Sequence, residues 1–240
     1  MTGRFGAVTD PQNLTWVMPA EGDMSTPPTA VIVAGGDLIT GDTIPPLPDH
    51  RFVIAADSGL HSAQALGIVV HLVVGDLDSA TPAAVAAAEA AGAAVERHPT
   101  DKDGTDLELA LDAALRRGLT PALVLGGAGF DRIDHFMANA LLLTHPRYAP
   151  MRPEWWVKGA HVAPVHDRLD IAGAAGDIVT LLAVGGPATG VSTTGLRWPL
   201  HQDTLPSGST RGVSNEMTGA AATVVVTDGS LLAIHTGGTP

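Results

Sequence analysis

Short, continuous apolar runs alternate with helical patterns over the first 150 residues of the chain. The runs are rich in valine, isoleucine, leucine and alanine, as is typical of strands buried on both faces of a parallel sheet. They cover residues 30–34, 52–56, 72–74, 94–97 and 122–125. Helical patterns lie between or after them, at residues 62–66, 81–92, 105–118 and 133–143. Strands that alternate with helices predict an α/β fold, with a mostly parallel sheet covered on both faces.

Two of these helices begin with clear capping signals. Thr81 and Pro82 place an N-cap residue before a proline at the first helical position. Thr105 and Glu108 have the spacing of a capping box. We therefore expect both threonines to close the first turns of their helices.

The pattern changes after about residue 150, where no strong helix is predicted. Four β-rich runs follow instead, at residues 178–182, 190–194, 223–226 and 231–235. Asp228 and Gly229 lie between the last two runs, which predicts a β-hairpin. The second part is therefore expected to be a smaller antiparallel β domain, although residues 155–157 suit either part. The expected divisions are an N-terminal arm at 1–28, an α/β domain at 29–150 and a β domain at 151–240.

The charge of the chain narrows its partners. The 240 residues include 25 acidic and 13 basic side chains, which give a formal net charge of -12. Such a surface repels nucleic acid and anionic lipid, so we expect neither as a partner. It also repels nucleotide phosphates, so nucleotide chemistry here requires metal cations.

Composition also bears on location. The chain has no cysteine, which excludes disulfides and thiolate chemistry and fits a reducing compartment. The first thirty residues show no signal peptide, and no stretch approaches the ~18 apolar residues of a membrane span. These features predict a soluble cytoplasmic protein with no membrane partner.

Six aspartates fall within fifty residues, directly after predicted strands or in the loops that follow. In an open α/β sheet, ligands bind outside the carboxyl ends of the strands. Carboxylates gathered there repel one another unless a cation is bound, and Mg²⁺ prefers such hard oxygen ligands. A single aspartate is more often a turn or cap residue, but a group of six predicts a Mg²⁺ site. These aspartates are Asp57, Asp76, Asp78, Asp101, Asp103 and Asp106.

Other nucleotide and catalytic motifs are absent. Neither of the two lysines, Lys102 and Lys158, follows a glycine, which excludes a P-loop. Residues 127–129 lack the third glycine of a dinucleotide fingerprint. There is no G-x-S-x-G or H-E-x-x-H segment, and the histidines have no metal-ligand spacing.

Six ordered segments resemble the thiamine pyrophosphokinase family. The resemblance extends from about residue 30 to 236, leaves out the N-terminal arm and is weak between residues 150 and 174. It implies a Rossmann-like three-layer domain that binds ATP and Mg²⁺, followed by a β-sandwich that binds thiamine. The segments are Ala56-Asp57-Ser58-Gly59, residues 75–79, residues 101–106, Arg132-Ile133-Asp134-His135 with Asn139, residues 194–200 and residues 212–216.

The resemblance also implies roles for individual residues in the first part. Asp76, Asp78 and Asp101 would hold Mg²⁺, with Asp57 as a further ligand or a group that orients one, while Lys102 and Arg132 would offset charge on the transferred group. The general base stays open among Asp76, Asp101 and Asp134. A role at a helix start is an alternative for Asp103, Thr105, Asp106, Asp134 and His135. The further ATP-binding residues that the resemblance implies are Asp57, Ser58, Asp103, Thr105, Asp106, Asp134, His135 and Asn139.

In the second part, the resemblance implies that Trp198, Ser214 and Asn215 bind thiamine. Trp198 would stack on the pyrimidine ring, and the alternative is a tryptophan in the sandwich core. Ser214 and Asn215 would hydrogen-bond the aminopyrimidine, and the alternative is that they are turn residues. Members of the family pair two chains around each thiamine site, so the resemblance also implies a homodimer.

The implied reaction transfers pyrophosphate from ATP to the hydroxyl of thiamine, giving thiamine diphosphate and AMP. Two other functions are open. The enzyme could act on another hydroxymethyl heterocycle such as a pterin, or the chain could be a non-catalytic nucleotide-binding regulator. Intact aspartates argue against a regulator, because unneutralised carboxylates repel one another without benefit to binding.

Overall fold

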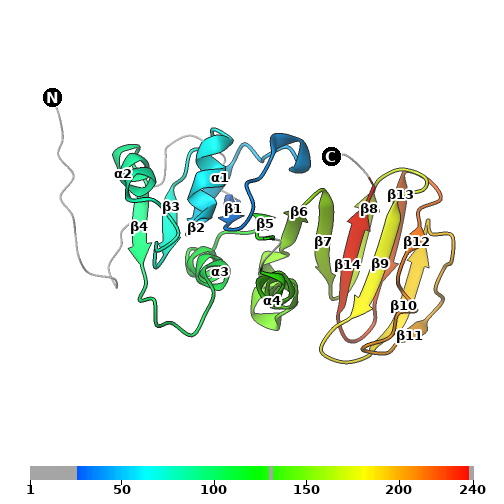
Figure 1. Ribbon diagram of the computed structural model, residues 1–240. Helices are drawn as coiled ribbons and strands as arrows, with labels where there is room; N and C mark the ends of the chain where they lie inside the picture. The colour runs from blue at the N-terminus through cyan, green and yellow to red at the C-terminus, as the bar shows by residue number, and fades with distance from the viewer. Residues whose placement is uncertain (1–25, 130–131, 238–240) are drawn as a thin grey trace.

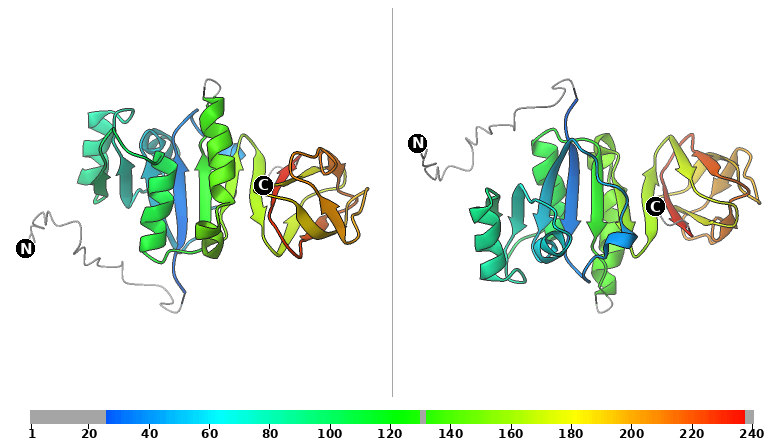
Figure 2. Two further views of the ribbon diagram at one scale, coloured as in Figure 1. Left: turned by 90° about the horizontal axis from the view of Figure 1, so that it is seen from below. Right: turned by 90° about the horizontal axis from the view of Figure 1, so that it is seen from above.

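The computed structural model describes residues 26–129 and 132–237, which form two parts that lie side by side (Figures 1 and 2). One ten-stranded sheet runs through both parts, and a four-stranded sheet lies in the second. The N-terminal arm predicted at residues 1–28 lies almost wholly outside the described residues.

The first part is the predicted α/β unit. Its six strands are parallel to one another and have the order β6-β5-β1-β2-β3-β4 in the sheet. The strands are β1 (Thr29–Ala34), β2 (Arg51–Ala56), β3 (Leu72–Gly75), β4 (Ala94–Arg97), β5 (Ala122–Gly126) and β6 (Glu154–Val157). The helices are α1 (Gly59–Ala65), α2 (Pro82–Ala90), α3 (Asp106–Arg116) and α4 (Ile133–Leu143), with short 3-10 helices η1 (Gly41–Thr43) and η2 (Pro146–Met151).

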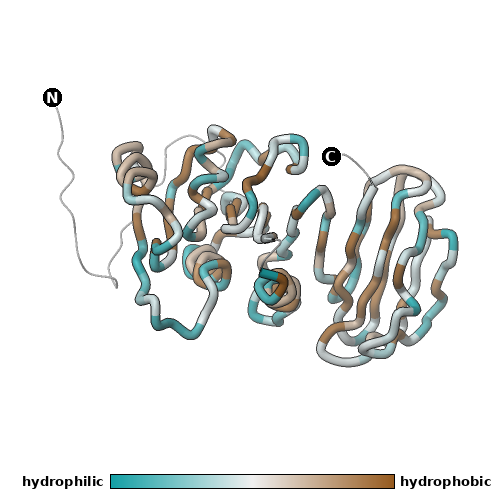
Figure 3. The backbone as a smooth tube through the Cα atoms, viewed as in Figure 1, coloured by the Kyte–Doolittle hydropathy of each residue, from teal (hydrophilic) through white to brown (hydrophobic). Residues whose placement is uncertain are grey.

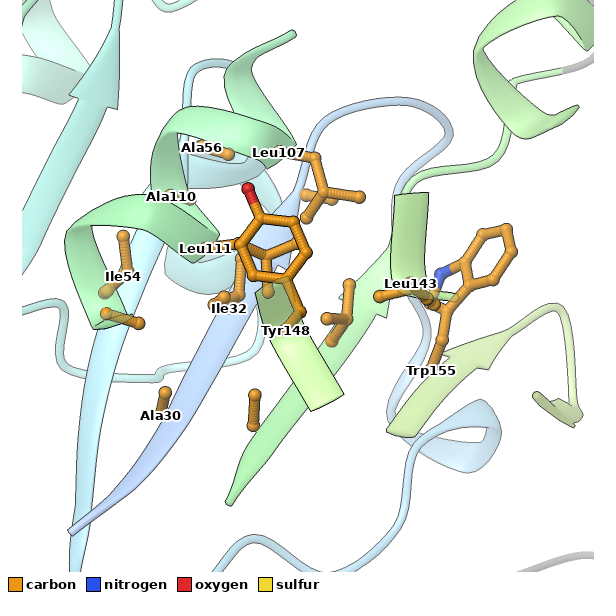
Figure 4. Packing of buried hydrophobic residues seen from close by; sticks show 14 of the residues in the cluster. Ala30, Ile32, Ile54, Ala56, Leu107, Ala110, Leu111, Leu143, Tyr148 and Trp155 are labelled. Atoms are coloured by element: carbon orange, nitrogen blue, oxygen red, sulfur yellow. The ribbon is translucent and has the colours of Figure 1, made fainter. Parts of the chain in front are cut away.

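Helices cover both faces of this sheet, as the apolar runs predict. Successive residues of a strand point to opposite faces, so Val31 and Val33 pack on the side covered by α1 while Ile32 packs under α3. Figure 4 shows the α3 face, where Leu107 and Leu111 meet Ile32 and the ring of Tyr148. The capping prediction is confirmed, because Thr81 accepts a hydrogen bond from the Ala84 amide and Thr105 accepts one from the Glu108 amide.

The second part is a two-layer antiparallel sandwich. Four strands continue the large sheet in the order β7-β14-β9-β12, and four more form the second sheet in the order β11-β10-β13-β8. Apolar side chains from both sheets, among them Val179, Val191 and Leu231, form the core between them, and Figure 3 shows hydrophobic and hydrophilic positions mixed along these strands. The strands are β7 (Ala160–Val165), β8 (Arg168–Ala172), β9 (Ile178–Ala183), β10 (Ala188–Thr194), β11 (Asp203–Leu205), β12 (Asn215–Glu216), β13 (Ala221–Val225) and β14 (Leu231–Thr236).

The predicted hairpin at Asp228-Gly229 is wrong. β13 pairs with β10 and β8, whereas β14 pairs with β7 and β9, so the two strands lie in different layers. The turn crosses from one sheet to the other and packs against the start of β10, since a Cβ on Gly229 would lie 2.5 Å from the Pro187 carbonyl oxygen. Burial of both strands in the sandwich core outweighs the local turn preference.

The stretch between the two predicted parts holds three strands, β6, β7 and β8, that the sequence did not reveal clearly. β6 adds to the parallel sheet beside β5 and forms an antiparallel pair with β7. β7 then pairs with β14, which joins the two parts through one continuous sheet. Residues 155–157, which suited either part, are the strand through which the parallel sheet passes into the antiparallel one.

Candidate functional site

Three carboxylates meet at the carboxyl edge of the parallel sheet. Asp57 directly follows β2, and Asp76 and Asp78 follow β3. Each offers one oxygen, and these oxygens all lie within 4.8 Å of one another. The main-chain amide of Asp57 donates to the Val74 carbonyl, which fixes the end of β2 against the end of β3. The predicted convergence of the first two aspartate groups is thus observed.

Asp57 is the buried member of this group. Its residue is only 7% exposed, and its Oδ1 atom has no hydrogen-bond partner. Burial raises the pKa of Asp57 first, and the nearby charges of Asp106 and Asp78 raise it further. Its φ of 44° lies in the left-handed region that non-glycine residues seldom adopt. A buried carboxylate oxygen without a donor, beside two more carboxylates, is a donor set that fits Mg²⁺.

Lys102 joins this edge from the loop before α3. Its ammonium Nζ lies 3.0 Å from Asp76 Oδ2 and 2.5 Å from Asp106 Oδ1. The Lys102 hydrogen bond holds the pKa of Asp76 below its usual value. Burial opposes the charged ammonium, but the hydrogen bonds to Asp106 and Asp76 outweigh it and raise the pKa of Lys102. Lys102 therefore remains a cation beside Asp57, Asp76 and Asp78, the group that we call the acidic edge.

Gly75 makes this approach possible, and sequence reasoning did not single it out. A Cβ on Gly75 would lie 2.9 Å from Asp106 Oδ1 and 3.2 Å from the Asp57 Cβ atom. Its φ of 145° is also one that glycine adopts far more readily than other residues. Any side chain here would push Asp106 away from the carboxylates that follow β2 and β3.

The three aspartates predicted between residues 101 and 106 do not act as one group. Asp106 lies in the first turn of α3 and binds Lys102, whereas Asp101 and Asp103 are exposed. Asp101, predicted as a metal ligand, lies outside the group formed by Asp57, Asp76 and Asp78. Sequence spacing could not separate these residues, because all three lie close together in the stretch that leads from β4 into the first turn of α3. Thr105 serves as the helix cap, as its alternative predicted.

A second charged cluster lies at the start of α4. The guanidinium of Arg132 donates to both carboxylate oxygens of Asp134 and contacts His135. The hydrogen bond from Arg132 lowers the pKa of Asp134 to about 2. Asn139, one turn further, is buried and donates to the Gly127 carbonyl, so it anchors α4 to the loop after β5.

The three residues predicted to bind thiamine, Trp198, Ser214 and Asn215, lie close together in the sandwich. The Asn215 side chain accepts from the Trp198 amide at 3.1 Å and donates to the Trp198 carbonyl at 2.7 Å. The Ser214 amide donates to the Thr180 hydroxyl. Trp198 is 53% exposed, so it is not a core residue, and the Arg197 guanidinium lies 4.9 Å from the centre of its ring. This segment presents a fixed, exposed aromatic surface.

The two halves of the predicted site do not meet within one chain. Seven strand spacings separate β2 from β12 in the order of the large sheet. At ~4.8 Å per spacing, this is a path of roughly 34 Å along the sheet. Asp57 lies at one end of that path and Asn215 at the other.

Within the described ranges, 26–129 and 132–237, no helix is both long and apolar enough to cross a membrane.

The fold and the site define a two-part α/β protein. One part carries an acidic edge suited to a metal and anionic substrates, and the other carries an aromatic surface on a β-sandwich. The family model for the thiamin pyrophosphokinase catalytic domain matches residues 47–152. The model for the vitamin B1 binding domain of the same family matches residues 167–231. The two matches together span well over half of the sequence, and the chain belongs to the thiamin pyrophosphokinase family.

Individual relatives agree with this assignment. Thiamine pyrophosphokinase from Bacillus subtilis is 28% identical over 214 residues, which cover 86% of this chain and 98% of the relative. A crystal structure of thiamine pyrophosphokinase from Bacillus subtilis matches with a TM-score of 0.76, covering 87% of this chain and 98% of that one. Thiamin pyrophosphokinase from Candida albicans shares the fold, with a TM-score of 0.70 at 14% identity, covering 88% of this chain and 90% of that one.

The predicted fold and the family resemblance are thereby confirmed. The family consists of enzymes that transfer pyrophosphate. A pterin-specific enzyme and a non-catalytic regulator are not favoured, because both parts of the chain match models of one family.

Proposed function

We propose that this protein transfers the β,γ-pyrophosphoryl group of ATP to the hydroxyl of thiamine, giving thiamine diphosphate and AMP. The observation that carries the proposal is the convergence of Asp57, Asp76 and Asp78 in a chain whose second part matches a vitamin B1 binding domain. The absence of cysteine fits a cytoplasmic enzyme.

Mg²⁺ would be held at the acidic edge by Asp57, Asp76 and Asp78. We assign the third position to Asp57 in place of Asp101, because Asp57 Oδ1 is buried without a donor while Asp101 is exposed. When bound, the cation supplies charge neutralisation for the phosphates of the donor. The protein itself must then position the two substrates in line and exclude water.

In the proposed reaction, the thiamine hydroxyl oxygen forms a bond to the β-phosphorus of ATP. The bond from that phosphorus to the oxygen bridging to the α-phosphate breaks, and AMP leaves with the electron pair. Lys102, held by Asp76 and Asp106, and Arg132, held by Asp134, supply positive charge near the transferred group. We retain their predicted roles in donor binding, with Ser58, Asp103, Thr105, His135 and Asn139 as further ATP-side positions.

The hydroxyl proton passes to a carboxylate of the acidic edge. Asp134 is a poor base, because the hydrogen bond from Arg132 lowers its pKa to about 2. Asp76 and Asp101 remain the candidates for the base.

We further propose that the protein is a homodimer in which Trp198, Ser214 and Asn215 of one copy face the acidic edge of the other. The long path between the two halves within one chain supports this arrangement. A second support is an apolar stripe on α4, where Ile133, Met137 and Leu141 recur every four residues and are 74%, 54% and 52% exposed. A helix that begins beside Arg132 and exposes such a stripe is suited to cover by a partner.

The activity is tested by measuring AMP released from ATP with Mg²⁺, with and without thiamine. We expect AMP and thiamine diphosphate to form in equal amounts, and only when both substrates are present. A pterin alcohol serves as the matched acceptor control. AMP formation that depends on the pterin and not on thiamine would overturn the proposal.

The shared site is tested by mixing two inactive chains. Asp78→Asn removes the acidic half and Trp198→Ala weakens the thiamine half, at a thiamine concentration far below the KM of the second variant. If the site is formed between copies, mixed dimers contain one intact site and activity rises above the sum of the separate variants. Activity equal to that sum would show that each chain contains its whole site.

A further inference from the structure

A cation already lies on the exposed aromatic surface of the sandwich. The guanidinium of Arg197 is 4.9 Å from the centre of the Trp198 ring. Its Nη1 atom also donates to Glu216 Oε2 at 2.8 Å. Arg197, Trp198 and Glu216 therefore form a compact group of one indole, one cation and one carboxylate. None of the roles proposed above uses Arg197 or Glu216.

The backbone around this group is fixed by its own hydrogen bonds. The Arg197 amide donates to the Glu216 carbonyl at 2.8 Å, and the Glu216 amide donates to the Asn215 side chain at 2.9 Å. That side chain also holds the amide and the carbonyl of Trp198. β12, which carries Asn215 and Glu216, pairs with β9 of the large sheet. The backbone that carries the indole and the carboxylate thus stays in place without the Arg197 side chain.

The contacts of the Arg197 side chain are, in contrast, easily exchanged. The side chain of Arg197 is 59% exposed and that of Glu216 is 37% exposed. Ion pairs and cation–π contacts at exposed positions contribute little, because water screens the charges. Rotation of the Arg197 side chain alone is enough to remove the guanidinium from the ring. A ligand cation that shields the indole and the carboxylate from water would gain more from them than Arg197 does.

Thiamine carries a charge that this group can accept. The proposed function places its pyrimidine ring on Trp198, and a single methylene joins that ring to the positively charged thiazolium ring. The positive ring then lies within reach of the Glu216 carboxylate and of the position that Arg197 occupies. Two cations that compete for one carboxylate repel each other, so binding of the ligand drives Arg197 away.

We propose that the cation of the acceptor exchanges with Arg197, so that Glu216 selects a positively charged acceptor. The inference rests on the proposed function for the identity of the acceptor as thiamine. In the free protein, Arg197 neutralises Glu216 and covers part of the indole. When the acceptor binds, Arg197 moves into solvent and the thiazolium takes its place beside the carboxylate. Glu216 thus determines specificity, and Arg197 is a competitor that the correct acceptor displaces.

The test compares thiamine with deazathiamine, an analogue of the same shape whose second ring is uncharged, by titration calorimetry on the full chain. Glu216→Gln should weaken thiamine binding by about tenfold and change deazathiamine binding by less than about twofold. Arg197→Gln should instead tighten thiamine binding by about threefold, because the ligand no longer displaces a cation. Arg168→Gln and Asp170→Asn are the matched controls, because this exposed pair lies on β8 of the other sheet. They should leave both affinities unchanged.

The opposite directions of the two effects distinguish exchange from a structural role. In turnover, Glu216→Gln should raise the KM for thiamine and Arg197→Gln should lower it, while the KM for ATP stays the same. If both substitutions weakened both ligands alike, the pair would only stabilise the segment, and the inference would fall while the proposed function stood. Opposite shifts in thiamine affinity, in a protein that forms no AMP from ATP and thiamine, would support the exchange and overturn the proposed function instead.

Discussion

Each part of the protein buries one aspartate among the residues described, and the two carboxylates have opposite surroundings. Asp57 and Asp177 are both 7% exposed. Asp57 Oδ1 has no donor, and burial raises the pKa of this residue. Asp177 Oδ2 accepts from the Ala174 amide at 2.8 Å and contacts His235 Nε2 at 3.0 Å, and the first of these bonds contributes most to its lowered pKa.

The difference indicates that the Asp57 carboxylate is placed to bind a ligand, whereas the Asp177 carboxylate stabilises the fold. A buried carboxylate oxygen without a donor, such as Asp57 Oδ1, weakens the folded state until something outside the chain satisfies it. Asp177, in contrast, has its partners within the sandwich and ties the loop before β9 to β14. The α/β part therefore carries the chemistry of the acidic edge, while the buried charge of the sandwich serves stability.

The largest expected effect is loss of activity at the acidic edge. Asp76→Asn or Asp78→Asn should lower turnover by about a thousandfold or more and leave the fold intact, because removing one carboxylate charge weakens the metal site. Turnover at several Mg²⁺ concentrations and the circular dichroism spectrum provide the measurement. Asp49→Asn, at an exposed position before β2, is the control. Near-normal activity of either variant at low Mg²⁺ would contradict the assignment.

Two tryptophans sharpen the contrast between a structural and a binding role. Trp155 is fully buried, and its indole donates to the Gly126 carbonyl, so Trp155→Ala should destabilise the protein by about 3–5 kcal/mol. Trp198 is half-exposed, so Trp198→Ala should barely change stability but weaken thiamine binding by about 1–3 kcal/mol. Chemical unfolding and thiamine titration of both variants decide the matter. A large fall in stability for Trp198→Ala with unchanged affinity would refute stacking.

The two buried aspartates should respond differently to neutralisation. Asp177→Asn should lower the free energy of unfolding at pH 7 by about 2 kcal/mol, because it removes charge from two hydrogen bonds. Asp57→Asn in EDTA should leave that free energy unchanged or raise it, and asparagine tolerates the left-handed backbone at this position. Urea unfolding of both variants provides the comparison, and a larger loss at Asp57 would contradict it.

The pH dependence follows from the sign of the Asp177 shift. Its pKa is lower in the folded than in the unfolded chain, where it is near 3.8. The stabilisation is thus present above pH 3.8 and is lost as the pH falls through the lower, folded value. Asp177→Asn should flatten this acid limb of the stability curve.

The smallest expected effect is a change in the thiamine KM on substitution of Ser214 or Asn215. Asn215→Ala removes the two hydrogen bonds that hold the Trp198 backbone, and Ser214→Gly keeps the left-handed backbone at that position while removing the hydroxyl. Both should raise the thiamine KM by about three- to tenfold, on the order of 1 kcal/mol, and affect the ATP KM less. Equal changes in the two KM values would remove the proposed division between donor and acceptor residues.

The α/β part could be predicted closely because its signals are local. Each buried parallel strand is one uninterrupted apolar run, and two of the helices between strands have a threonine cap, Thr81 and Thr105. Asp57, Asp76 and Asp78 could be predicted to meet because they directly follow adjacent parallel strands. Asp101 could not be placed in the same way, since a loop of several residues separates it from β4.

The sandwich was harder to predict because its partners are distant in sequence. The local turn signal at Asp228-Gly229 could not tell a hairpin from a crossing between two sheets. Nor could the sequence show that Trp198 is exposed, or that Asn215 clamps its backbone from 17 residues away.

Sequence patterns were enough to predict the family, the alternation of strands and helices, and the group of aspartates at one edge of the sheet. These follow from short-range patterns of burial and capping that hold in any compact arrangement of the chain. Packing in three dimensions leaves Asp57 buried with no partner for its Oδ1 atom, lets Asp106 approach Gly75, and pairs Lys158 with Asp37 across 121 residues. Such features depend on which side chains packing brings together, and local patterns carry no record of that choice.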